Sequence, residues 1–280
     1  MTKSKLPHLI KLLDDDDPIV QAAVRAELWK TDGDVSHELQ ELGLQLSMTE
    51  VRDLSKAIAP ARRARLERDW VIPDSALNTP DGDWDTFEAI LQMISDFLHD
   101  GVHPRSLLSD LIDDLAKEIE DQYPSPEVRD VIKELFESGR FEGNRTDYYN
   151  AFNSDLVWSI NNGKSNPIGL VIIFMLVSNR LGLDVYGCNL PGHFLAQTVI
   201  DSQPILIDAF TKGRQISVEE LLSNPKKLSE IARNAIKSPA SLGMVLQRVL
   251  TNLKVSLEKI AHQEDVALVD KLIQSLNGHV

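Results

Sequence analysis

The chain has 280 residues, of which 42% are hydrophobic and 26% are charged, so it can bury a sizeable core in one large or two smaller domains. Asp and Glu outnumber Lys and Arg by 43 to 29, which gives a formal net charge of -14 at pH 7. Such a surface repels phosphate backbones and anionic bilayers, so we expect neither nucleic acid nor a membrane as a partner. The most apolar stretch, residues 168–177, is about half as long as a membrane helix and predicts a buried core helix.

Cys188 is the single cysteine, so the chain cannot form an internal disulfide or a cysteine-rich zinc site. The N-terminal residues lack the long apolar run of a signal peptide. Both features predict a reducing, cytoplasmic location. We expect no cofactor. Nor do we expect a metal ion at His99 and His103, because their helical spacing is interrupted by Gly101 and followed by Pro104.

Residues 1–70 form a predicted N-terminal helical segment, because residues from about 7 to 66 have helical periodicity for most of their length. An aspartate run at residues 14–17 precedes Pro18, and both features suit the exposed N–H groups at the start of a helix. Short helices joined by an acidic turn resemble a HEAT-like repeat pair, and such a segment would serve packing or partner binding. Residues 71–83 are rich in Pro, Asp, Asn and Gly and predict a linker and domain boundary.

Amphipathic patterns predict a series of helices after this linker. Their predicted bounds are 84–98, 106–119, 126–136, 167–180 and 216–236, with a helical hairpin at 241–276. We expect Asp85, and Asn153 with Ser154, to cap the helices that follow them. An ordered loop rich in Asn and aromatic residues carries Tyr148 and Tyr149.

Residues 183–208 predict a small antiparallel sheet. The predicted strands are 183–187, 194–200 and 204–208, with turns at 190–192 and 201–203. His193 stands at the start of the second strand and Asp208 at the end of the third. If the register brings these ends together, Asp208 can hold the imidazole in one orientation, which is half of a Cys–His–Asp arrangement.

Several short motifs occur in order along the chain: FEGN, YYNAFNSDL, NPIGLVIIFMLVSNRLGL, GCNLPGHFLAQ and ILIDAF. Together they resemble the SirB-type transglutaminase-like family of bacteria, over about residues 84–280. The resemblance implies an α+β, mostly helical fold with a transglutaminase-like (cysteine-protease-like) core at 84–240 and a small antiparallel sheet. The helices at 241–280, with RVLTNLK, resemble one unit of that family's tetratricopeptide-like tail.

Enzymes of the superfamily use Cys, His and Asp, and the resemblance places His193 and Asp208 at the last two positions. The cysteine position falls at residues 166–168, where the sequence reads Asn-Pro-Ile. None of these side chains replaces a thiolate. The resemblance therefore implies a remnant cleft without its nucleophile. Its candidate residues are His193, Asp208, Asn166, Pro167, Tyr148 and Tyr149.

We therefore predict a non-catalytic regulatory or protein-interaction protein, built on a degenerate enzyme fold and bound by a protein partner. One alternative is an amide hydrolase or acyltransferase that uses Cys188 or Ser165. Cys188 precedes a turn rather than starting a helix, which disfavours it, and Ser165 would have to reach His193. Another alternative is a small ligand or a metal ion bound in the remnant cleft.

Overall fold

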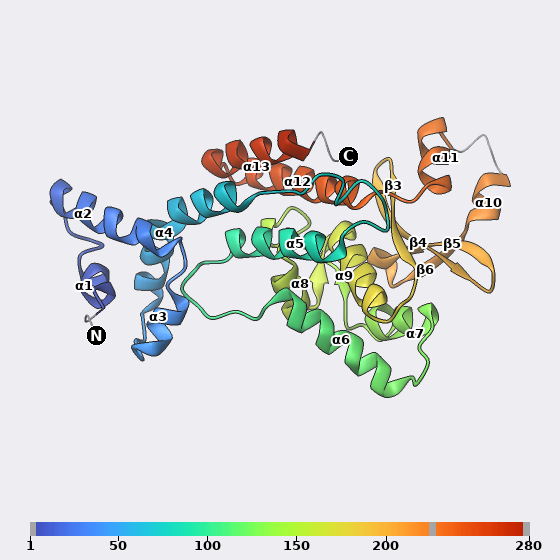
Figure 1. The fold of residues 1–280 in the computed structure, drawn as a ribbon, viewed down its shortest axis with the longest axis horizontal. Helices are drawn as coiled ribbons and strands as arrows, with labels where there is room; N and C mark the ends of the chain where they lie inside the picture. The colour runs from blue at the N-terminus through green and yellow to red at the C-terminus, as the bar shows by residue number, and fades with distance from the viewer. Residues whose placement is uncertain (1–3, 224–227, 277–280) are drawn as a thin grey trace. The chain divides into compact units, whose positions relative to one another are not determined.

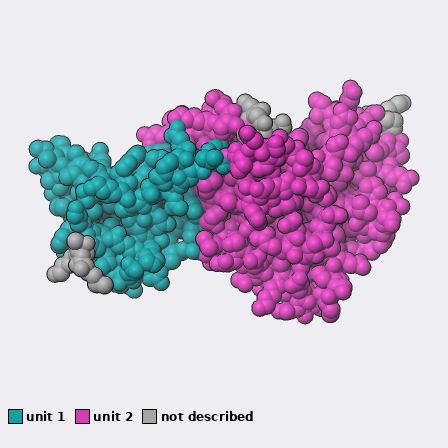
Figure 2. All heavy atoms as spheres, in the orientation of Figure 1, with its two compact units in different colours: residues 1–71, 96–105 teal, residues 72–95, 106–280 magenta. Residues whose placement is uncertain are grey.

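The computed structural model describes residues 4–223 and 228–276. The chain forms two compact units, one of residues 1–71 with 96–105 and one of residues 72–95 with 106–280 (Figure 2). The first unit therefore includes residues 96–105, which follow the predicted linker at 71–83 in the chain. Within the described ranges, no helix is long and apolar enough to cross a bilayer.

The first unit is made of short helices followed by one long helix (Figure 1). They are α1 (Leu6–Lys11), α2 (Pro18–Leu28), the 3-10 turn η1 (Trp29–Thr31), α3 (Ser36–Glu41) and α4 (Met48–Asp69). The carboxylate of Asp17 accepts from the backbone N–H of Ile19, and Pro18 occupies the first turn of α2. The predicted helix start at the acidic run is thus confirmed. The HEAT-like relationship stays a prediction.

The segment 96–105 completes the core of the first unit. The side chain of Val102 joins an apolar cluster of buried residues. The cluster contains Leu6, Ile10, Val24, Leu28, Val35, Leu39, Leu54, Ile58 and Val102. Arg62 donates to the carbonyl of Asp100 at 2.7 Å. Gly101 has a φ of 69°, and a Cβ there would lie 2.2 Å from the carbonyl oxygen of Gly33, so only glycine fits.

The second unit holds most of the helices of the chain. They are α5 (Trp84–Leu98, whose last turn belongs to the first unit), α6 (Leu108–Gln122), α7 (Val128–Ile132), the π-turn η2 (Lys133–Glu137), the 3-10 turn η3 (Ala151–Ser154), α8 (Leu156–Asn162), α9 (Pro167–Arg180), the 3-10 turn η4 (Ala209–Thr211), α10 (Val218–Ser223), α11 (Glu230–Lys237), α12 (Leu242–Lys259) and α13 (Gln263–Ser275). The predicted C-terminal helical hairpin is confirmed as α12 and α13. Its tetratricopeptide-like character stays a prediction.

Two predicted caps are wrong by a short distance. The first residue of α5 is Trp84, and the carboxylate of Asp83, not Asp85, accepts from the backbone N–H of Thr86 at 2.9 Å. Helix α8 is capped by Asp155, which accepts from the backbone N–H of Trp158 at 2.9 Å, rather than by Asn153 or Ser154. In both cases an acidic side chain lies next to the first helical residue and takes the exposed N–H group.

The second unit also contains two sheets. Strand β1 (Glu142–Gly143) pairs in parallel with β2 (Lys164–Ser165). The strands β3 (Val185–Leu190), β4 (His193–Ile200), β5 (Gln203–Asp208) and β6 (Arg214–Ser217) form an antiparallel sheet in chain order. Strand β6 corrects the prediction of helix from residue 216. Ile216 pairs instead with Leu206 and packs on the apolar cluster beneath α10.

Helix α9 is the buried centre of the second unit and confirms the predicted core helix. Every residue from 168 to 178 is buried, and the ring of Phe174 meets Phe136 edge-on at 5.6 Å. Helix α9 contacts β3 and β4, while Ile236 of α11 packs with Cys188 on β3. The sheet is therefore covered by α9 on one face and by α10 and α11 on the other (Figure 1).

Candidate functional site: the beginning of helix α9

The beginning of α9 is capped and closed. The side-chain oxygen of Asn166 accepts from the backbone N–H of Gly169 at 2.9 Å. Just before it, Ser165 is fully buried, and its hydroxyl donates to the carbonyl of Asn153 at 2.8 Å and lies 3.0 Å from the hydroxyl of Ser159. A Cβ on Gly169 would lie 2.1 Å from the hydroxyl oxygen of Ser165. This hydroxyl is enclosed and already bonded on both sides.

A buried pair of amides ties the preceding loop to the same point. Asn153 donates to the carbonyls of Asp147 and Tyr148 at 3.1 and 3.0 Å, and its oxygen accepts from Asn144 at 2.9 Å. The backbone N–H of Asn144 donates in turn to the carbonyl of Ser165 at 2.8 Å. The two asparagine residues are only 1% and 5% exposed, so they hold the loop as a fixed support.

The two tyrosines that were predicted to line the cleft lie on the surface of this loop. Tyr148 and Tyr149 are 45% and 48% exposed, and their rings meet edge-on at 5.2 Å. Tyr148 also meets the ring of Phe210 at 6.1 Å. Phe210 lies against Gly143, where an added Cβ would be 2.5 Å from the ring. Because Gly143 pairs with Ser165, these rings lie beside the beginning of α9.

His193, at the start of β4, and Asp208, at the end of β5, lie at the same end of the sheet but are not hydrogen-bonded to each other. Ala196 pairs with Ile207, so Asp208 falls opposite Leu195, two residues from His193 and on the same strand face. Such diagonal neighbours are about 7–8 Å apart. Asp208 accepts instead from the backbone N–H of Thr211 at 3.1 Å and from Arg214 at 3.3 Å. His193 is exposed and makes no side-chain hydrogen bond or ion pair within the described residues.

The thiol of Cys188 lies inside the molecule. It is fully buried with Leu195 and Leu206, and it donates to the carbonyl of Ala235 at 3.3 Å. Burial raises the pKa of the Cys188 thiol to about 12. The protein therefore keeps this sulfur in its protonated, weakly nucleophilic form.

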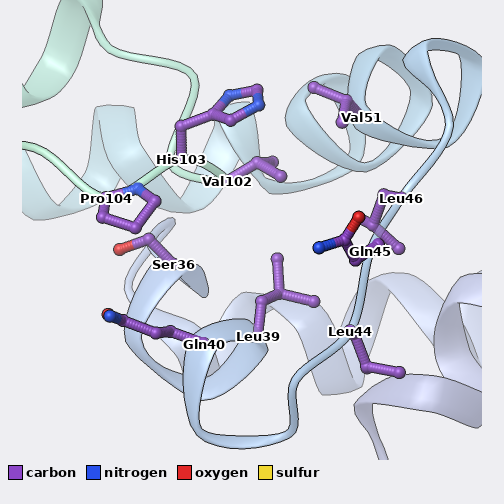
Figure 3. Close-up of a pocket in the computed structure, with 10 residues that line it drawn as sticks. All are labelled: Ser36, Leu39, Gln40, Leu44, Gln45, Leu46, Val51, Val102, His103 and Pro104. Atoms are coloured by element: carbon purple, nitrogen blue, oxygen red, sulfur yellow. The ribbon is translucent and has the colours of Figure 1, made fainter.

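A separate cavity lies within the first unit. Its volume is about 400 Å³, and its apolar walls include Leu39, Leu46 and Val102 (Figure 3). His103 lines it as well and is bonded to Asp100 at 2.6 Å. It holds none of the residues predicted for the remnant cleft. Across residues 4–223 and 228–276, no group of three or more His, Cys, Asp or Glu residues is arranged to hold a metal ion.

Sequence reasoning missed three residues of the site. Phe210 lies within the ILIDAF motif, two residues after Asp208, so its aromatic character was a usable signal. Arg145 stacks over the ring of Phe210 at 4.8 Å, and Lys259 places its ammonium 3.5 Å from the ring centre of Tyr149. The local sequence around Lys259 does not predict its contact with Tyr149, since that contact depends on the position of α12.

Comparison with known proteins agrees with this architecture. The family model described as the transglutaminase-like superfamily matches residues 105–251, which is more than half of the chain. A UPF0162 protein of Xylella fastidiosa is 32% identical over 155 residues, which cover 53% of this chain and 55% of the relative. F-box only protein 21 of Mus musculus is 31% identical over 127 residues, which cover 42% of this chain and 20% of the relative.

The chain thus spans about half the length of the Xylella proteins that it matches. No solved structure matches it. The matched region includes the capped start of α9, the antiparallel sheet with His193 and Asp208, and most of α12. On this match, the chain belongs to the transglutaminase-like superfamily.

Proposed function

We propose that this chain is a non-catalytic protein of the SirB-type branch of the superfamily and that it acts by binding a protein partner. The observation that carries the proposal is the set of side chains at the beginning of α9. The side-chain oxygen of Asn166 caps the helix, and Pro167 has neither an N–H group nor a reactive side chain. The turn where the resemblance puts a nucleophile therefore contains none.

The two other candidate nucleophiles support the same conclusion. The Cys188 thiol is buried and its pKa is raised to about 12, so thiolate is scarce at neutral pH. The hydroxyl of Ser165 is bonded to Asn153 and Ser159 instead of to an imidazole. A nucleophile needs a base within hydrogen-bond reach, and among the described residues the partners of these two groups are a hydroxyl and backbone carbonyls.

A role in protein interaction is supported by the surface beside α9. Tyr148, Tyr149 and Phe152 are each more than 40% exposed, and aromatic side chains are enriched where proteins bind one another. The matched region takes up only 20% of F-box only protein 21, so the same kind of domain also occurs inside a much longer chain. We further propose that the repeat-like helices at both ends add partner surface and that the protein works in the cytoplasm.

The test is the reactivity of the single thiol with iodoacetamide across pH, in the wild type and in His193→Ala. We expect slow alkylation with the same pH dependence in both proteins, and fast alkylation only after unfolding in urea. His262→Ala, far along the chain and paired with Asp265 at 3.1 Å, is the matched control. A low thiol pKa that rises only in His193→Ala would overturn the proposal in favour of an enzyme.

Ser165 is tested separately with a fluorophosphonate probe, which labels activated serines. We expect no labelling of the wild type, and none in Ser165→Ala. Labelling of the wild type that disappears in Ser165→Ala would identify a serine hydrolase and would contradict the proposal.

A further inference from the structure

Five side chains form a continuous row beside the beginning of α9, which we call the cation–aromatic strip: Lys259, Tyr149, Tyr148, Phe210 and Arg145. The ammonium of Lys259 lies 3.5 Å from the ring centre of Tyr149. The rings of Tyr149 and Tyr148 are 5.2 Å apart, and those of Tyr148 and Phe210 are 6.1 Å apart. The guanidinium of Arg145 lies 4.8 Å from the ring centre of Phe210. A positive charge therefore stands at each end of three rings.

The strip is open to solvent and is held in shape from below. Arg145, Lys259 and both tyrosines are exposed. The loop that carries Tyr148 is fixed by the buried amide of Asn153, which donates to the Tyr148 carbonyl. Rigid aromatic side chains lose little conformational freedom when a ligand covers them, so they are efficient anchors for binding.

The two cations of the strip form no ion pair within the described residues. Within the described part of the chain, neither Arg145 nor Lys259 has a carboxylate partner, although acidic residues outnumber Lys and Arg by 43 to 29. Nearby cations behave differently: Lys254 on the same helix bonds Asp270 at 2.7 Å, and Arg140 bonds Glu118. The strip thus offers two cations without an ion pair on a chain with net charge -14.

We propose that the cation–aromatic strip binds an acidic segment of a partner protein, with an apolar or aromatic side chain between its carboxylates. This inference rests on the proposed interaction function and names the chemistry of its partner. The carboxylates would meet Lys259 and Arg145, whose guanidinium has N–H donors left after its bond to the Phe210 carbonyl at 3.3 Å. The central side chain would pack on the tyrosine rings. Single-stranded nucleic acid is also anionic and stacks on rings, but it carries a phosphate at every nucleotide, whereas the strip supplies only two cations, so a segment with a few carboxylates fits better.

The experiment is fluorescence polarisation of the full chain with a labelled octapeptide. The probe has alternating Asp and Glu around a central Tyr-Leu pair, and a second probe has Asn and Gln in their place. We expect the acidic probe to bind about tenfold more tightly than the neutral one and to weaken with added salt. Arg145→Gln and Lys259→Gln should each weaken it by roughly three- to tenfold.

Matched variants separate the strip from net charge. Lys254→Gln and Arg140→Gln also remove one positive charge each, but from cations that are already paired, so both should bind the acidic probe as the wild type does. Tyr149→Ala should weaken both probes, since it removes a ring that either one covers. Thermal unfolding of each variant confirms that it is folded.

Three outcomes would overturn the inference: no binding of the acidic probe, equal weakening by Lys254→Gln and Lys259→Gln, or tighter binding of labelled oligothymidylate than of the peptide. The alkylation experiment reads the buried thiol and is independent of this surface. A slow thiol together with no peptide binding would therefore remove the strip as a partner site while the non-catalytic proposal stands. A reactive thiol coupled to His193 would instead remove the proposed function itself.

Discussion

The substitution Asn153→Asp tests whether the buried amide network holds the loop beside α9. The amide nitrogen of Asn153 donates to the carbonyls of Asp147 and Tyr148, and its oxygen accepts from Asn144. Aspartate has nearly the same shape, but an ionised carboxylate donates no hydrogen bond. In the variant, a buried negative oxygen would face two carbonyl oxygens, which is repulsive on both sides.

The size of the effect follows from the proton that the variant must take up. A protonated carboxyl can still donate to one carbonyl, so the folded-state pKa is raised above the unfolded value of about 3.9. Keeping that proton at pH 7 costs up to about 4 kcal/mol, at about 1.36 kcal/mol per pH unit. The second carbonyl loses its donor, which adds about 1 kcal/mol. Because the folded-state pKa is the higher one, the penalty grows as the pH rises above 3.9.

The assay is urea unfolding of the wild type and the variant at pH 5.5 and pH 7, both above the sequence pI of about 4.9. We expect Asn153→Asp to lower the free energy of unfolding by about 3 kcal/mol at pH 5.5 and about 5 kcal/mol at pH 7. Asn162→Asp is the control: it also removes an amide donor, to the Trp158 carbonyl at 2.8 Å, but at an exposed position where the new carboxylate stays hydrated, so its loss should be small. A loss at pH 7 below about 1 kcal/mol, or one that does not change with pH, would refute the reasoning.

Three further substitutions test the surroundings of the site. Burial raises the pKa of Glu88 even though Arg180 donates to it at 2.8 Å. Arg180→Gln should therefore lower the free energy of unfolding by about 2–4 kcal/mol at pH 7 and by less at pH 5.5, where the unpaired carboxyl of Glu88 protonates more easily. Equal losses at the two pH values in urea unfolding would contradict this. Gly169→Ala puts a Cβ 2.1 Å from the Ser165 hydroxyl and should lower the free energy of unfolding by about 2–3 kcal/mol. Adding Ser165→Ala should recover part of this loss, whereas a double variant whose loss equals the sum of the two single losses would rule out the clash. Pro167→Cys, in a background without the native cysteine, puts a thiol in the first turn of α9; iodoacetamide should show a pKa below about 8.5, and a higher value would refute an effect of the helix terminus.

Where a structural signal is local, the sequence predicted the element well. Helix α9 was expected at 167–180 and spans Pro167–Arg180. Its signals, an Asn-Pro start and an unbroken apolar run, all lie within the helix and its cap. Strand β6 was missed for the opposite reason. It has only four residues, Arg214–Ser217, and exists because Leu206 on β5 offers a partner for Ile216. Pairing of this kind is not encoded in a short window of residues.

The candidate site also combines features that are local in sequence with contacts that depend on packing. The sequence alone shows that residues 166–168 carry no thiol and that Tyr148 and Tyr149 are adjacent. It does not show that Asp208 would be taken by Thr211 and Arg214, since this choice depends on the turn after β5. Nor does it show that Lys259, at the far end of α12, meets Tyr149. Contacts between residues distant in sequence are set by packing, so they needed the structure.

The closed start of α9 and the open strip beside it have a common physical origin. Ser165 and Asn153 are bonded into a buried network, and that network fixes the loop from Asn144 to Tyr148 against the helix. A catalytic centre needs a reactive group exposed at this point, whereas a binding surface needs rigid rings held outward on a firm support. The hydrogen bonds of Ser165 and Asn153 thereby hold the loop that carries the tyrosines. Loosening the network at Asn153 should therefore weaken peptide binding at Tyr148 and Tyr149 while the second unit is still folded.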